Sequence, residues 1–71
     1  MDRNEQEQLT ANIAIALDRA EFFLREARDN LSAGKTYEAW GLIDNISGEL
    51  EEADDWFRVL AANDESEENN D

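Results

Sequence analysis

One helical pattern ends and a second begins within residues 31–39, LSAGKTYEA. Gly34 suits the left-handed residue that closes a helix, and Thr36 can cap the helix that follows. The chain contains no proline that would break either pattern. Because a connection this short leaves consecutive helices as antiparallel neighbours, the stretch predicts a two-helix hairpin.

Apolar residues recur at alternating steps of four and three on both sides of this turn. Before the turn they are Ile13, Leu17, Ala20, Leu24, Ala27 and Leu31. After the turn they are Ala39, Ile43, Ile46, Leu50, Ala53, Phe57 and Leu60. This heptad spacing is typical of helices packed nearly side by side, and it excludes strands, which alternate at every second residue. The two rows are therefore predicted to form the seam of an all-α hairpin.

The predicted organisation is one domain over residues 1–63 and a tail over residues 64–71. The first helix is expected over about 4–32, capped by Asp2 or Asn4, and the second over about 37–62, with the turn at 33–36. The tail is acidic and contains no apolar residue. A segment without apolar residues cannot offset the entropy lost on ordering, so the tail is predicted to be disordered.

Apolar and aromatic side chains are more numerous than one seam can cover. Leu9, Ala16 and Phe23 widen the stripe on one flank of the first helix. Further surplus residues are Ile15, Phe22, Tyr37, Trp40, Trp56 and Val59. Since two helices of this size make a thin core, the surplus predicts self-association, most simply a homodimer that forms a four-helix bundle. The alternative is that these residues are scattered surface apolars, as on many proteins.

The three glycines, at 34, 41 and 48, are spaced seven residues apart. Gly41 and Gly48 fall on the side of the second helix away from the seam, and each costs roughly 1 kcal/mol relative to alanine in a helix interior. Three interpretations remain open: close approach of a partner, a bend at Ser47-Gly48, or simple tolerance. The first adds Gly41 and Gly48 to the surplus apolar residues as a self-association or partner patch.

Composition excludes most catalytic chemistry. The chain has no cysteine and no histidine, so thiol chemistry, the usual zinc sites and the commonest general base are absent. We therefore expect no enzyme activity, metal or cofactor. The polar start, residues 1–6, predicts no signal peptide, and no apolar run has the length of a membrane span. A cytoplasmic protein that does not bind membranes is expected.

Acidity is the strongest bulk property. Nineteen acids against six bases give a net charge of −13, which disfavours direct binding to nucleic acid. The densest acidic cluster in the second helix consists of Glu49, Glu51, Glu52, Asp54 and Asp55, together with Asp44. Within it Asp44, Glu51 and Asp55 share one narrow side of the helix, with Glu52 beside them. These carboxylates predict a protein partner, with a basic nucleic-acid-binding protein as the specific form.

In size, charge and helical class the chain resembles the DNA-mimic and anti-defence inhibitors of phages. That resemblance implies inhibition of an enzyme that binds nucleic acid. Two alternatives come from other classes. One is a structural or regulatory homodimer, such as an antitoxin-like or assembly component, and the other is an acidic surface adapted to high salt.

Overall fold

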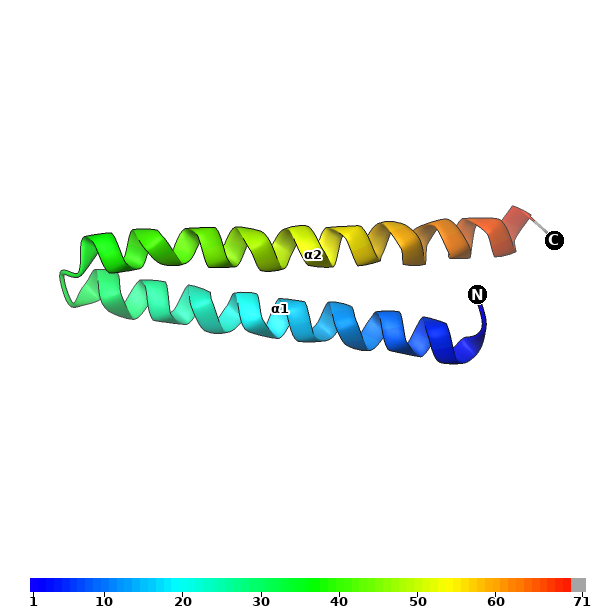
Figure 1. Ribbon diagram of the computed structural model, residues 1–71, viewed down its shortest axis with the longest axis horizontal. Coiled ribbons are helices and arrows are strands. Elements are labelled where there is room, and N and C mark those ends of the chain that lie inside the picture. Colours follow the sequence, from blue (N-terminus) through cyan, green and yellow to red (C-terminus); the bar gives the residue numbers. More distant parts are fainter. Residues whose placement is uncertain (70–71) are drawn as a thin grey trace.

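The computed structural model contains two long helices that lie side by side and run in opposite directions, as Figure 1 shows. Helix α1 is Arg3–Ser32, and helix α2 is Thr36–Asn69. The structure describes the backbone of residues 1–69 and the side chains of residues 1–63. Within residues 1–69 there is no strand, so the predicted all-α hairpin is confirmed.

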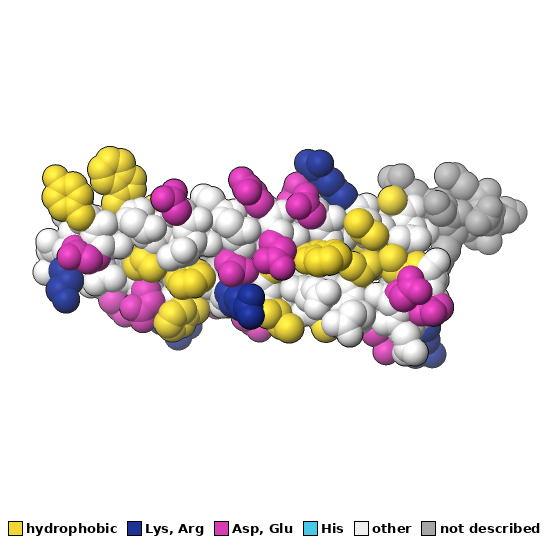
Figure 2. Space-filling view, viewed as in Figure 1, with side chains coloured by type: hydrophobic (Ala, Val, Ile, Leu, Met, Phe, Trp, Pro, Cys, Tyr) yellow, Lys and Arg dark blue, Asp and Glu magenta, His cyan; other side chains and the backbone are white. Residues whose placement is uncertain are grey.

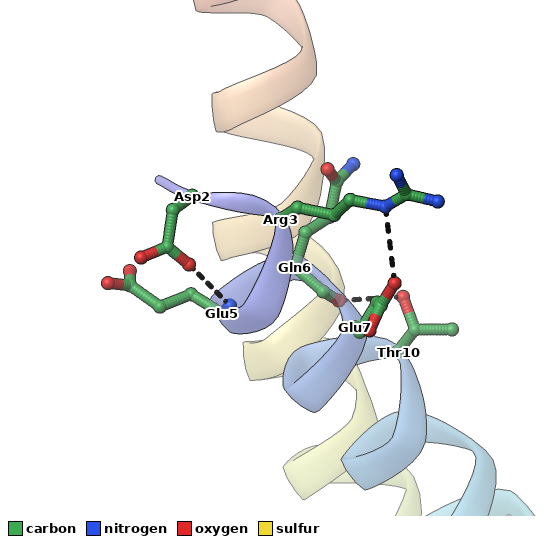
Figure 3. A network of polar contacts seen from close by, with 6 residues as sticks. All are labelled: Asp2, Arg3, Glu5, Gln6, Glu7 and Thr10. Carbon is green, nitrogen blue, oxygen red and sulfur yellow. Dashed lines mark hydrogen bonds and ion pairs between the residues drawn. The ribbon is translucent and has the colours of Figure 1, made fainter.

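Asp2 begins α1, which settles the choice between the two predicted capping residues. Its carboxylate Oδ1 accepts a hydrogen bond from the backbone N–H of Glu5 at 2.8 Å (Figure 3). In the first two turns of α1, Nε of Arg3 lies 3.3 Å from the carboxylate Oε1 of Glu7 on the exposed side of the helix (Figure 3). A capping carboxylate satisfies a free N–H group and interacts favourably with the positive end of the helix.

Gly34 closes α1 in the left-handed conformation that the sequence predicts, with φ of 79°. The N–H of Lys35 reaches back to the carbonyl of Asn30 at 2.8 Å, the bond that defines this type of helix ending. Thr36 is the first residue of α2, so it is not the capping residue that precedes the helix. Lys35 holds that place, and its carbonyl accepts from the N–H of Ala39 at 3.0 Å.

Helix α2 continues to Asn69, seven residues beyond the predicted end at residue 62. Residues 61–69 contain alanine and glutamate, which favour helix, and neither glycine nor proline to stop it. Residues 70–71 and the side chains of residues 64–69 lie outside the described part. The backbone of residues 64–69 is helical, although the sequence assigns these residues to a disordered tail, and for residues 70–71 disorder stays a prediction.

The core between the helices is small. Among residues 1–63, seven apolar residues are buried, and five of them are alanine: Leu9, Ile13, Ala16, Ala20, Ala27, Ala39 and Ala53. None of the large side chains described is fully buried. Alanine lets the two helix backbones approach closely but removes little apolar surface from water. The hairpin is therefore held by close helix contact over a thin core.

Half of the predicted seam is wrong. The row that contains Ile13, Ala20 and Ala27 does face α2, as predicted. The other predicted row is exposed, from 40 % for Leu17 to 61 % for Leu31, and it consists of Leu17, Leu24, Leu31, Ile43, Leu50 and Phe57. Its place is taken by the flanking residues Leu9, Ala16 and Phe23 of α1 with Leu42, Glu49 and Trp56 of α2, which are buried or half-buried.

The reason is geometric. The apolar stripe is three positions wide in each heptad, whereas the contact between two helices covers only two. One row of large residues must therefore remain outside the hairpin.

Candidate protein-interaction surfaces

The six large residues left outside the seam form a surface that we call the apolar strip. Its members are Leu17, Leu24 and Leu31 of α1 and Ile43, Leu50 and Phe57 of α2. An open groove between the helices is lined by Leu24, Leu31 and Ile43, with Ala27 and Ala39 also in its lining. Since seven residues make about two helical turns, the remaining members continue the same two rows. Both helices thus present one continuous apolar row to the same broad face.

The strip is the surface that sequence reasoning missed. The heptad pattern identifies its residues as apolar but predicts that they lie inside the hairpin. The signal that could have corrected this was the second heptad row, Leu9, Ala16 and Phe23, which offers an equally regular way to pack α1. In α2 the corresponding row is interrupted by Glu49.

The α2 residues that pack in the seam include buried polar atoms. The carboxylate Oε2 of Glu49 and the indole Nε1 of Trp56 are buried, and neither has a hydrogen-bond partner among the described residues. Buried polar atoms without partners cost free energy relative to the unfolded chain. The seam residues of α2 therefore stabilise the hairpin less than the seam residues of α1 do.

The four predicted acidic residues are all exposed on α2, and we call them the acidic face: Asp44, Glu51, Glu52 and Asp55. Asp44, Glu51 and Asp55 lie opposite the buried alanines of α2. Glu52 sits nearer α1, where it lines a groove with Arg19.

Few of the described carboxylates are paired with a cation. Among residues 1–63 the ion pairs are Arg3–Glu7 and Arg58–Asp54, the latter at 3.1 Å. Neither ion pair includes a member of the acidic face, so no Lys or Arg side chain among residues 1–63 forms an ion pair with these four carboxylates.

The predicted apolar patch is divided by the structure into separate clusters. Ile15 is exposed, and it lines the groove between the helices together with half-buried Trp56. Phe22 is exposed and its ring meets that of Phe23 edge-on, with centroids 5.7 Å apart. Phe23 belongs to the seam, so it supports Phe22 rather than forming a free surface.

A second cluster lies at the turn end of α2. Tyr37, Trp40 and Gly41 line a shallow pocket together with Asp44 of the acidic face. Tyr37 is 81 % exposed, and Figure 2 shows hydrophobic rings that project from this end of the molecule. The cluster joins an aromatic surface directly to a carboxylate.

Gly48 and Val59 line neither the pocket that contains Tyr37 nor the groove that contains Ile15. Val59 is exposed in the last third of α2, and Gly48 is near its middle. A Cβ added at Gly41 or Gly48 would meet no atom within 4 Å. Nothing within the described chain therefore requires glycine at either position, and close approach of a partner stays a prediction.

Charged and apolar side chains are intermixed on part of the surface. Figure 2 shows one broad side of the hairpin, on which acidic and basic side chains lie among hydrophobic ones. No group of three or more potential metal ligands occurs in the part of the chain that the structure describes. Among the same residues, neither helix has an apolar stretch long enough to cross a membrane.

Compared with known protein families, with curated proteins and with solved structures, the chain shows no match. The acidic face and the apolar strip are therefore the two features from which a function can be argued.

Proposed function

We propose that the protein is a small, non-enzymatic protein-binding module that acts through its acidic face. The observation that supports this proposal is the exposure of Asp44, Glu51, Glu52 and Asp55 on one helix without a paired cation. Uncompensated charge on a rigid helix steers the approach of a partner of opposite charge and contributes to affinity. The partner is accordingly a basic protein surface.

A basic groove that normally holds nucleic acid has the required chemistry. Asp44, Glu51 and Asp55, at intervals of seven and four residues, present negative charge along one side of α2, as phosphates do along a strand. The proposed activity is that of a cytoplasmic inhibitor or adaptor that competes with nucleic acid for such a groove. Tyr37 and Trp40, beside Asp44, add an apolar contact at the turn end of the same helix.

The test is charge reversal on the acidic face. The variant Glu51→Lys, Glu52→Lys, Asp55→Lys should lose at least about tenfold in affinity for proteins captured by the wild type from its host, because attraction becomes repulsion. The matched control reverses three exposed acids of α1, Asp18→Lys, Glu21→Lys and Asp29→Lys, and should keep most of the affinity. Wild-type binding should weaken with salt and with added DNA. Binding that is indifferent to reversal, salt and DNA would reject the proposal.

A second candidate function is a structural or regulatory homodimer in which a four-helix bundle is the working unit, as in an antitoxin-like or assembly component. The specific observation in its favour is the thin alanine core beside an exposed apolar strip. Monomeric proteins rarely leave a continuous apolar surface of this length in water. Sedimentation at micromolar concentration should give twice the chain mass of 8.1 kDa, and a monomer would exclude this candidate.

A further inference from the structure

We infer that a second copy of the chain covers the apolar strip, with both turns at the same end and α1 of each copy against α2 of the other. This arrangement deepens the homodimer candidate, on which it rests. It replaces the sequence prediction, which assigned self-association to Ile15, Phe22 and the tryptophans, and it leaves the acidic face free on the outside of the bundle.

The strip has the composition of a core and not of a surface. Its six residues are all large and apolar, and each is exposed to 40 % or more. The interior of the single hairpin, by contrast, is mostly alanine. Covering the strip would give the bundle the large buried side chains that the hairpin lacks, at about 1.5–3 kcal/mol for each one fully removed from water.

The area is sufficient for a stable dimer. Each row of the strip spans 15 residues, or about 22 Å at the standard rise. Because Leu24 lies level with Ile43, the two rows are offset along the hairpin and together extend over about 30 Å. The broad face of the hairpin is 18 Å across. Two such faces in contact bury on the order of 1,100 Å², which exceeds the roughly 1,000 Å² expected of a specific interface.

The two rows of the strip also fit one another. Each contains three residues at seven-residue intervals, and the helices that carry them are antiparallel. Rotation by half a turn about the long axis places Leu24 over Ile43 and Leu17 over Leu50 of the other copy, while Leu31 and Phe57 extend the strip at its two ends. A surface that matches itself under a two-fold rotation is the usual basis of a homodimer.

The distribution of charge favours the dimer with both turns at one end over the alternative dimer, in which the turns lie at opposite ends. Helix α1 has six acids and four arginines, a net charge of −2, whereas α2 has eleven acids and Arg58 alone, a net charge of −10. With both turns at one end, the two α2 helices lie on a diagonal of the bundle, about 14 Å apart. With the turns at opposite ends, they would be neighbours at about 10 Å. The first arrangement reduces repulsion between the most acidic elements.

The edge of the strip supports the same arrangement. Arg28 and Trp40 line the groove at the turn end. When α1 of one copy lies against α2 of the other with the turns together, Arg28 comes level with Trp40 of the second copy. A guanidinium over an indole ring is a favourable contact, worth about 0.5–2 kcal/mol according to its exposure.

The deciding experiment measures the distance between the two turns. The chain has no cysteine, so Lys35→Cys provides a single site for a spin label in the turn of each copy. With both turns at one end, the label-to-label distance from electron–electron double resonance should be about 20–25 Å, that is, one helix-packing distance plus two label arms. Turns at opposite ends would give about 40 Å or more, because α1 alone has 30 residues. A long distance would overturn the arrangement, and a monomer would overturn the inference.

The surface is tested by two matched variants of this labelled chain. Leu24→Lys places a charge in the strip and should raise the dimer dissociation constant at least about 100-fold, because a charge would be buried in the interface. Phe22→Lys changes a residue of slightly greater exposure outside the strip, 57 % against 50 %, and should change it less than about threefold. The reverse order would overturn the strip as the interface.

If Leu24→Lys does not fold, the turn-to-turn distance in the Lys35→Cys chain still decides between the outcomes. Failure of the dimer is also distinguishable from failure of the acidic-face proposal, because partner binding and its loss on charge reversal are measured separately.

Discussion

The two helices have nearly the same length but differ in how many residues they bury and how much charge they carry. Helix α1 buries five residues, among them Leu9 and Ile13, and is close to neutral. Helix α2 buries only Ala39 and Ala53 among its residues up to 63, and it carries most of the negative charge. The comparison teaches that core residues and surface charge can be distributed unequally between two helices. Helix α1 contributes most of the buried side chains, and α2 carries most of the exposed negative charge.

The largest expected effect tests the packing side of this comparison. Ile13→Asp places a carboxylate at a site that is only 5 % exposed. The cost of several kcal/mol should unfold a hairpin with so thin a core. Ile15→Asp, two residues away on an exposed site, should cost less than about 1 kcal/mol and keep the helical circular dichroism spectrum. Equal stability of the two variants in urea would show that α1 does not pack as described.

An intermediate effect compares glycines in the turn and in α2. Gly34→Ala should lose roughly 1 kcal/mol, because its φ of 79° is strained for a residue with a Cβ. Gly41→Ala and Gly48→Ala should each gain roughly 1 kcal/mol, because both lie in open helical positions. Thermal melts at one fixed concentration measure all three. Should either α2 variant lose stability, a close contact at that glycine, such as one made by a partner, would be indicated.

The smallest expected effect concerns the exposed charge of α2. Arg58→Gln removes the cation that pairs with Asp54, and both side chains are largely exposed. The free energy of unfolding should fall by no more than about 0.5 kcal/mol, and the difference should shrink at high salt. Urea titrations at two salt concentrations provide the measurement. A loss of several kcal/mol would mean that the charge of α2 is closely coupled to packing.

The sequence by itself determined the local structure of this protein. The hairpin follows from heptad spacing, and the ending at Gly34 follows from the absence of a Cβ. For the start of the first helix the sequence offered Asp2 and Asn4 as caps, and the structure uses Asp2. The acidic face also follows from the sequence, since exposure of charged side chains is the ordinary outcome of folding. Each of these features depends on residues that are close together along the chain.

Only the tertiary structure decided which row of large apolar residues is buried. In α1 the rows through Leu9 and through Leu17 are equally regular, and by hydrophobicity alone the row with Leu24 and Leu31 is the better core. The choice depends on how far each helix is rotated about its own axis. A connection of three residues restricts that rotation, and two helices can cover only part of a three-position stripe. That rotation is a property of the packed pair, and it leaves the apolar strip on the outside.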